Sequence, residues 1–420
     1  MSNAIIELYY YYIIVYVLGF IVWVKILSYL IEPLIRIGHL EIEFPRGEVR
    51  TFGQASDSKV KVTINDLKTL RNLVLNPDPA LGEAYMDKSI VIEDDNLYGL
   101  LSLLAKNISN QPDSLMSKFL AFKSKLMFWF QKSNLPSRSK KNVEHHYDLS
   151  PELYKLFLDV DQQYSCAFFQ KEDDSLEQAQ INKKQHIAKK LLLKPGMTVL
   201  DIGCGWGGLS LSLAKHYDVN VLGITLSEEQ KLIAEARAIR EGLQDKVNFK
   251  ILDYRTDCGT FDRIVSVGMF EHVGTRNYID YFEAIRNKLK ENGIALIHTI
   301  GRMCPPGNNS PWLDKYIFPG GYTPALSEMV ASVEQNYLCI TDIEVWRLHY
   351  AKTLRHWHSR FAENEEQIRE IYDDRFCRMW RYYLTACEIS FRHYQHVVFQ
   401  VQITKEQEAV PLTRNYLYES

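Results

Sequence analysis

A glycine-rich turn at residues 199–208 carries the strongest chemical signal in the sequence. It reads Val-Leu-Asp-Ile-Gly-Cys-Gly-Trp-Gly-Gly, with apolar strand residues first and glycines where a helix should begin. Glycines there allow positive φ angles and let the backbone approach a ligand closely. Nucleotide-like ligands bind at the carboxyl ends of strands in open α/β sheets. The turn alone leaves two interpretations open, a nucleotide site and a simple tight turn.

The residues around this turn narrow the choice of ligand. Asp201 can accept hydrogen bonds from the loop or from a ligand ammonium, and Asp253 ends the third predicted strand. The Asp-x-Gly-x-Gly order, residues 193–197 and Asp253 resemble the S-adenosylmethionine-dependent methyltransferases. In that class the glycines contact the amino-acid part of the cofactor, and an acid after the third strand lies by the adenine. The resemblance implies S-adenosylmethionine (SAM) as cofactor.

The end of the second predicted strand departs from the usual pattern. Dinucleotide folds and most of these methyltransferases place an acid there for the ribose hydroxyls, whereas this chain has none at the strand tip. Thr225 and Gln230 are candidates for the ribose contacts instead. Ser227 is also expected to cap the next helix, with Glu228 and Glu229 favouring its dipole. The predicted cofactor residues are Tyr164, Ser165, Asp201, Gly203, Cys204, Gly205, Trp206, Gly207, Thr225, Gln230 and Asp253.

Four further segments combine with the turn. Residues 144–149, 163–167, 267–274 and 297–301, together with 201–208 and 225–227, closely resemble the cyclopropane-fatty-acyl-phospholipid synthases and their mycolic-acid relatives. The resemblance covers roughly residues 36–420 and is closest from residue 144. In the N-terminal part residues 81–87 match best, and residues 1–35 fall outside it.

The resemblance implies an alkylation of a hydrocarbon. The methyl of SAM moves to a cis double bond of a phospholipid acyl chain, and the resulting carbocation loses a methyl proton and closes to a ring. Bound bicarbonate is the implied base. Its implied ligands are Cys166, Glu271, His298, Ile300 (through its backbone) and Tyr350. A carboxylate and an imidazole can hold such an anion, with pKa values tuned by burial near an apolar tunnel.

Each of these residues also has a structural interpretation. Glu271 fits a first-turn helix acid, His298 a core histidine and Cys166 a small buried hydrophobe. For His349, His356 and His358, no carboxylate or cysteine at the usual spacing completes a metal-ligand set, so we expect packed or solvated histidines and no metal.

Two other functions stay open at this point. One is a SAM-dependent C-methyltransferase that gives a methyl- or methylene-branched acyl chain. Its reaction would pass through the same carbocation as ring formation and would differ only in what the carbocation then becomes. The other is a non-catalytic SAM-binding membrane protein, against which the set of Cys166, Glu271 and His298 speaks. A small-molecule N- or O-methyltransferase would need neither a large N-terminal domain nor this base site.

The elements that must position these residues follow from hydrophobic periodicity. Short apolar strands alternate with helical patterns, which predicts a parallel sheet covered by helices. Strands are expected at 198–202, 219–224, 247–252, 262–267 and 294–299, with closing strands at 339–348 and 396–404. The predicted fold class is α/β, a Rossmann-like SAM methyltransferase sheet with helices on both faces. A smaller α+β N-terminal domain and an N-terminal apolar helix precede it.

The N-terminal part shows hairpin strands within residues 40–64. Helices should follow, one capped by Asn65 or Asp66 and one by Asn96. The predicted organisation is a membrane-associating segment, a lipid-contacting domain, a linker and a catalytic domain, at 1–35, 36–133, 134–143 and 144–420.

Two segments suggest contact with a membrane. Residues 8–24 are 17 consecutive uncharged residues, at the lower limit for a bilayer span, and no signal-peptide features flank them. Lys25, Arg36 and His39 follow, so the positive-inside rule places the rest of the chain in the cytoplasm. The alternative is a helix buried in the N-terminal domain. Residues 114–143 contain seven Lys or Arg and no acid, interleaved with aromatic residues, which suits an anionic membrane or a helix with solvated lysines.

Composition sets the remaining limits. The net charge of −3 over 420 residues gives no overall positive charge of the kind that binds nucleic acid. The seven cysteines form no Cys-x-x-Cys pair, which argues against a disulfide framework and fits a reducing compartment. We therefore expect a cytoplasmic enzyme at the inner face of the cell membrane. Its expected partners are a bilayer with unsaturated acyl chains and, from the resemblance, a second copy in a homodimer.

Overall fold

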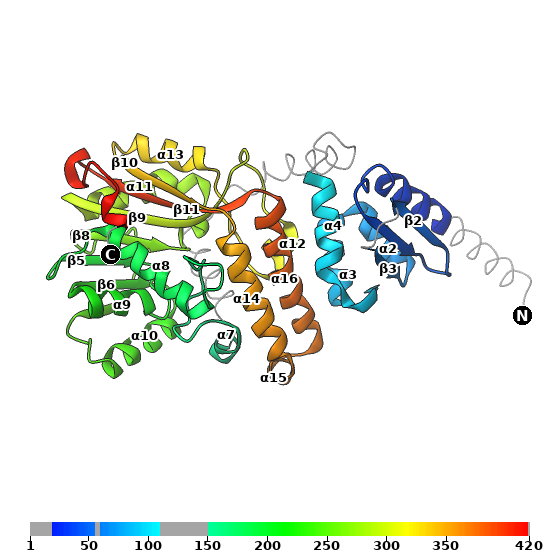
Figure 1. Cartoon of the computed structure of the whole chain (residues 1–420), viewed down its shortest axis with the longest axis horizontal. Coiled ribbons are helices and arrows are strands. Elements are labelled where there is room, and N and C mark those ends of the chain that lie inside the picture. Colours follow the sequence, from blue (N-terminus) through cyan, green and yellow to red (C-terminus); the bar gives the residue numbers. More distant parts are fainter. Residues whose placement is uncertain (1–18, 55–58, 110–149, 419–420) are drawn as a thin grey trace, which may run out of the picture. The chain divides into compact units, whose positions relative to one another are not determined.

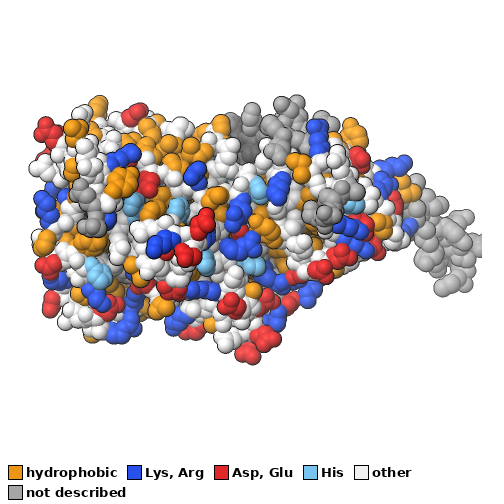
Figure 2. Space-filling model, in the orientation of Figure 1, with side chains coloured by type: hydrophobic (Ala, Val, Ile, Leu, Met, Phe, Trp, Pro, Cys, Tyr) orange, Lys and Arg blue, Asp and Glu red, His pale blue; other side chains and the backbone are white. Residues whose placement is uncertain are grey.

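The computed structural model describes residues 19–54, 59–109 and 150–418, which form two compact units (Figure 1). Unit 1 contains the described residues up to 109 together with Ser310–Tyr316 and Glu366–Tyr394. Unit 2 contains the other described residues, from 150 onward. The predicted linker and the basic segment at 114–143 lie outside the described residues and stay predictions. On the face in Figure 2, Lys and Arg side chains are interspersed with Asp and Glu.

Unit 1 is built on a four-stranded sheet with the order β2-β1-β3-β4. Its strands are β1(His39–Glu43), β2(Val49–Gly53), β3(Lys59–Ile64) and β4(Ile90–Ile92). The helices wholly or mainly in unit 1 are α2(Leu67–Leu75), α3(Pro77–Met86), α4(Leu97–Ser109), α12(Pro311–Tyr316), α15(Glu365–Ile371) and α16(Asp374–His393), with η1(Glu93–Asp95). The predicted hairpin is confirmed, since β1 and β2 pair antiparallel. Two predicted caps are also confirmed, because Asp66 accepts from Thr69 N and Asn96 from Gly99 N.

A helix over residues 19–31 begins the described chain. One of its faces is buried, with Val24 only 1% exposed. Val22, Ile26 and Tyr29 lie one turn apart on the opposite face and are exposed. The described part of the predicted apolar segment therefore packs on one side only. No helix among the described residues is long and apolar enough to cross a bilayer, and residues 1–18 lie outside them.

Unit 2 is built on a seven-stranded sheet with the order β10-β11-β9-β8-β5-β6-β7. The strands are β5(Thr198–Ile202), β6(Asn220–Thr225), β7(Val247–Ile251), β8(Phe261–Val267), β9(Leu289–Arg302), β10(Cys339–Trp346) and β11(His396–Thr404). Strands β5 to β9 are parallel, and β11 and β10 close the sheet antiparallel. All seven predicted strands are confirmed. β8 starts one residue earlier than predicted. β9 starts five residues earlier, at Leu289, because residues 290–293 are polar and give no apolar signal.

Helices cover both faces of this sheet, as predicted. They are α7(Pro151–Phe157), α8(Leu176–Leu191), α9(Gly208–Tyr217), α10(Glu228–Arg240), α11(Tyr278–Lys288), α13(Leu326–Gln335), α14(His349–Glu363) and α17(Asn415–Tyr418), with η2(Phe270–His272), η3(Thr275–Asn277) and η4(Gln407–Ala409). Ile264 of β8 packs in the core that includes α11 and α13, whereas the next residue, Val265, packs with α8, α9 and α10. Figure 1 shows α11 and α13 on one side of the strands and α9 and α10 on the other. The carboxyl ends of β5, β6 and β8 are left to form a site.

Candidate active site

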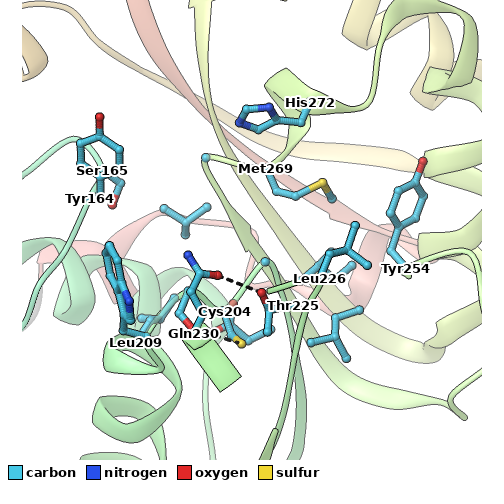
Figure 3. Close-up of a pocket in the computed structure, with 18 of the residues that line it drawn as sticks. Tyr164, Ser165, Cys204, Leu209, Thr225, Leu226, Gln230, Tyr254, Met269 and His272 are labelled. Carbon is cyan, nitrogen blue, oxygen red and sulfur yellow. Dashed lines mark hydrogen bonds between the residues drawn. The ribbon is translucent and has the colours of Figure 1, made fainter. Parts of the chain in front are cut away.

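A cleft lies at the carboxyl ends of these strands, with an empty volume of about 1300 Å³ that includes open solvent. Figure 3 shows its lining, with Tyr164 and Ser165 on one side and Tyr254 on the other. The predicted cofactor residues that line it are Tyr164, Ser165, Asp201, Gly203, Cys204, Gly205, Trp206, Thr225, Gln230 and Asp253. Gly207 is the one predicted cofactor residue that does not line it. We call this cleft the cofactor pocket.

The glycine-rich turn has the predicted positive φ angles at Gly203, Gly205 and Gly207. A Cβ added to Gly205 would meet no protein atom within 4 Å, so the space beside it is the open pocket. A Cβ on Gly207 would come within 2.7 Å of the Phe249 ring and 3.0 Å of Ala234 Cβ. The structure thus gives Gly205 room for a ligand and gives Gly207 a packing role.

Asp201 lies at the end of β5, almost completely buried. Its Oδ2 accepts a hydrogen bond from Ser210 Oγ of α9 at 2.6 Å. Burial raises the pKa of Asp201 to about 6, against the opposing effects of the Ser210 hydrogen bond and the Lys183 charge. The carboxyl group is therefore anchored to the helix that follows the turn.

Thr225 and Gln230 meet at the tip of β6. Thr225 Oγ1 donates to Gln230 Oε1 at 2.9 Å, and the Gln230 amide nitrogen points away from Thr225 toward the open pocket (Figure 3). Ser227 Oγ accepts from Gln230 N, which confirms the predicted helix cap. The same short segment therefore starts α10 and presents polar groups where the usual acid is missing.

Asp253 lines the pocket but is already engaged. Arg255 Nε donates to its Oδ1 at 2.8 Å, and Arg255 Nη2 lies 2.5 Å from its Oδ2. Although burial raises the pKa of Asp253, the hydrogen bonds and charge of Arg255 bring it below its ordinary value. The carboxylate is thus ionised and held in place by Arg255, a partner that the sequence analysis did not consider.

None of the five predicted base-site residues lines the cofactor pocket. Glu271 lies just behind it, in the loop whose Met269 and His272 face the pocket. Glu271 Oε1 accepts from the backbone N–H of Ile300 at 2.6 Å, while Oε2 has no hydrogen-bond partner among the described residues. Burial raises the pKa of Glu271 to about 7. The structure therefore brings Glu271 and Ile300 together and leaves one carboxyl oxygen available.

His298 precedes Ile300 by two residues on β9, so both lie on the same face of the strand. Gln400 Nε2 lies 3.1 Å from His298 Nδ1, and the Trp346 ring packs edge-on against the imidazole at 5.1 Å. Burial, together with the charges of nearby lysines, lowers the pKa of His298 well below its ordinary value. The imidazole is neutral at physiological pH.

Cys166 lies in a segment that contacts α14, the helix that carries Tyr350. Cys166 is fully buried, and burial raises the pKa of its thiol, so it is present as the thiol. The next residue, Ala167, donates its N–H to Thr353 of α14. Tyr350, one turn earlier on α14, packs edge-on against Trp357. No hydrogen bond joins Cys166, Glu271 and His298 directly in the described part of the chain, so their common role stays a prediction.

Sequence analysis missed several residues of the pocket wall. Tyr254, Met269 and His272 all line it, and burial lowers the pKa of His272 to about 4. Their positions directly after strand ends were the available signal. Of the histidines considered for metal binding, His349 and His356 stack on Phe169. Within the described ranges no group of His, Cys, Asp and Glu is arranged to hold a metal ion.

Comparison with known proteins places this site in a family. The family model for mycolic acid cyclopropane synthetase matches residues 135–401, and a model for a domain of unknown function matches residues 29–118. The chain is 40% identical over 361 residues to the cyclopropane-fatty-acyl-phospholipid synthase of Escherichia coli (strain K12), covering 83% of this chain and 91% of that protein.

A mycobacterial relative and a solved structure agree with this result. The chain is 36% identical over 265 residues to cyclopropane mycolic acid synthase 1 of Mycobacterium tuberculosis, covering 60% of this chain and 92% of that protein. A solved structure of a mycolic acid cyclopropane synthase complexed with SAH and CTAB has a TM-score of 0.59 and 33% identity, covering 63% of this chain and 97% of that one. The chain therefore belongs to the mycolic acid cyclopropane synthetase family and is a SAM-dependent methyltransferase.

Proposed function

We propose that the chain transfers the methyl of SAM to the cis double bond of a phospholipid acyl chain and forms a cyclopropane ring. The observation that carries this proposal is the buried Glu271 behind the cofactor pocket, with one carboxyl oxygen unpaired among the described residues. Methyl transfer to an alkene leaves a carbocation that must lose a proton before the ring can close, and a buried carboxyl group beside the pocket is placed to help accept that proton. The phospholipid substrate is supported by the 40% identity to the Escherichia coli synthase.

The cofactor pocket fits SAM by the chemistry of its lining. When bound, SAM supplies an electrophilic methyl group. Gly205 gives its backbone room beside the ligand, and the Gln230 amide is the polar group for the ribose. Tyr164, Trp206 and Tyr254 provide aromatic surface around it. The chain thus offers a cationic cofactor neutral polar and aromatic groups together with the carboxyl groups of Asp201 and Asp253.

The base site must accept the proton that ring closure releases. Bicarbonate, when bound, supplies a small base for this step. The free oxygen of Glu271 and the neutral imidazole of His298 fit an anion that both donates and accepts hydrogen bonds. The Ile300 N–H is already used by Glu271, so Ile300 orients the carboxylate. Cys166 and Tyr350 complete the proposed set.

The product can be tested in cells. Phospholipid acyl chains from cells with and without the protein are compared by mass analysis. We expect a gain of one CH2 per modified chain together with loss of the alkene's reactivity. Unchanged acyl chains in cells that produce folded protein would contradict the proposed function.

We also propose that the chain works at the inner face of a membrane, where its acyl substrate lies. The exposed apolar face of the helix at 19–31 supports this, with Val22 at 50%, Ile26 at 36% and Tyr29 at 68% exposed. Exposed Lys25 and Arg36 lie beside it in sequence. An apolar face flanked by basic residues suits an anionic bilayer surface.

Replacing Val22, Ile26 and Tyr29 by serine is expected to weaken binding to vesicles of anionic phospholipid by roughly tenfold or more, since each inserted apolar side chain contributes up to ~1.5–3 kcal/mol. Sedimentation with phosphatidylglycerol vesicles measures it. The matched control replaces three exposed apolar residues elsewhere in unit 1, Val49, Leu75 and Val91. Equal losses in both triple variants would show that residues 19–31 are not the contact.

A further inference from the structure

Lys183 of α8 is a buried ammonium that sequence analysis did not single out. Its side chain is 0% exposed. Its Nζ donates to Gln163 Oε1 at 2.8 Å and to Ser165 Oγ at 2.7 Å. Both acceptors are uncharged, and both residues line the cofactor pocket. Burying an ammonium on neutral acceptors is unfavourable by itself, which points to a role at the pocket.

The backbone of the same stretch is held by another residue of α8. Gln180 lies one turn before Lys183, and its Nε2 donates to the carbonyl oxygens of Gln163 and Ser165 at 3.2 and 3.0 Å. Gln180 therefore fixes the backbone of this pocket wall. Lys183 fixes the two side chains that project from it.

A third set of contacts ties this wall to the glycine-rich turn. Lys184 Nζ donates to Asp161 Oδ2 at 2.6 Å, and Arg237 of α10 pairs with the other oxygen of Asp161. Arg237 also donates to the carbonyl of Trp206 at 3.0 Å. The pocket wall at 161–165 is thus a preformed part of the site.

We propose that Lys183 is a positioning residue for SAM, whose ammonium holds the side chains of Gln163 and Ser165 in the geometry that the cofactor meets. Without it, both side chains gain rotamers that binding must then restrict, and each immobilised side chain lowers affinity. This inference rests on SAM occupying the cofactor pocket. It does not depend on which product the enzyme makes.

The charge of Lys183 also responds to pH in a defined range. Burial lowers its pKa to about 8. The titratable groups that face it are Asp159 and Asp161, Cys166, Lys184 on its own helix, Asp201 of β5 and His298 of β9. Above about pH 8 the neutral amine makes weaker hydrogen bonds, so its hold on Gln163 and Ser165 loosens.

The test is Lys183→Met, which keeps the length and removes the ammonium. Calorimetric titration with SAM should give a Kd roughly tenfold to a hundredfold higher. In enzyme assays kcat at saturating SAM should fall less than KM for SAM rises. The Kd of the wild type should also increase from pH 7 to pH 9 more than that of the variant, because only the wild type loses this charge.

The matched control is Lys190→Met on the same helix. Lys190 is also 0% exposed, but its Nζ pairs with Glu344 at 2.5 Å, outside the cofactor pocket. This variant should bind SAM with a Kd near that of the wild type. Unchanged affinity in Lys183→Met, or equal losses in both variants, would overturn the proposal.

If the Lys183→Met protein does not fold, a second pair of variants tests the proposal. Ser165→Ala and Gln163→Leu each remove one acceptor and leave the lysine in place. Each should raise the Kd for SAM several-fold, and wild-type affinity in both would overturn the proposal. If the wild type binds SAM but forms no ring, the proposed function fails while these affinities still test Lys183.

Discussion

Replacing Glu271 by Gln is expected to lower kcat by about 10²–10⁴-fold, the usual contribution of a group in general acid–base chemistry. The amide keeps the volume of the carboxyl group and can still accept from the Ile300 N–H through its oxygen. The amide NH2 that replaces one carboxyl oxygen can only donate, so the variant loses the acceptor for the O–H of a bound bicarbonate. Because Glu271 does not line the cofactor pocket, the Kd for SAM should stay near that of the wild type, and calorimetry beside steady-state kinetics separates the two effects.

The raised pKa of Glu271 predicts how both kcat and stability change with pH. Burial raises the pKa of Glu271 from 4.5 to about 7, so the carboxylate that the reaction needs forms only as pH rises through about 7. The kcat of the wild type should therefore increase across that range, and Glu271→Gln should lack this increase. The raised pKa also favours folding while Glu271 is protonated. That stabilisation is fully present below about pH 4.5 and is lost as pH rises through about 7.

A buried glutamate elsewhere provides the control for Glu271→Gln. Glu388 of α16 is 2% exposed and pairs with Arg392, so Glu388→Gln tests the loss of a buried carboxylate in unit 1. It should leave kcat near the wild-type value. Depleting bicarbonate should slow the wild type, and adding it should not rescue Glu271→Gln. Turnover near the wild-type rate in Glu271→Gln would remove this residue from the chemistry.

Replacing Gly205 by Val is expected to abolish measurable SAM binding. The backbone at Gly205 has φ +53°, where a β-branched residue is strained by ~1–3 kcal/mol. The added side chain would also project into the open space beside the turn, which is the cofactor pocket. The strain lowers the stability of the fold, whereas the side chain that occupies the pocket blocks the ligand and accounts for the loss of affinity. Calorimetric titration with SAM measures the loss.

Gly196→Val separates backbone strain from pocket blockage. Gly196 also has a positive φ and open space for a Cβ, but it lies before β5 and does not line the pocket. This variant should lose stability to a similar extent and still bind SAM. Retained affinity in a folded Gly205→Val protein would mean that the cofactor lies elsewhere.

The fold of unit 2 could be predicted because its strands are short apolar runs between helical patterns. The sequence could not show that β9 begins at Leu289, since residues 290–293 are polar. They lie at an irregularity in the pairing of β8 with β9, between the pairs Phe261–Leu289 and Arg263–Ile294. It also could not show that α16, near the end of the chain, packs in unit 1 with α4 and α3. That packing joins residues almost 300 positions apart.

The cofactor pocket was the more predictable part of the site, because its turn is continuous in sequence. Thr225 and Gln230 could be suggested for the ribose contacts because they lie only five residues apart, at the end of a predicted strand and the start of the next helix. Lys183 could not be found this way, since it stands beside Lys184 in a polar stretch and reads as an exposed helix residue. Its burial depends on the segment at 161–165, which packs across α8 only in the folded unit.

The most direct test of the central claim follows the fate of the transferred methyl. Purified protein is incubated with SAM carrying a CD3 group and with vesicles of phospholipid that contains cis-unsaturated acyl chains, and the acyl chains are then analysed by mass spectrometry. Ring formation breaks one C–D bond, so we predict that the modified chains gain CD2 and lose the alkene. Chains that retain all three deuterons of the methyl group, or chains that gain no deuterium, would contradict cyclopropane formation by this protein.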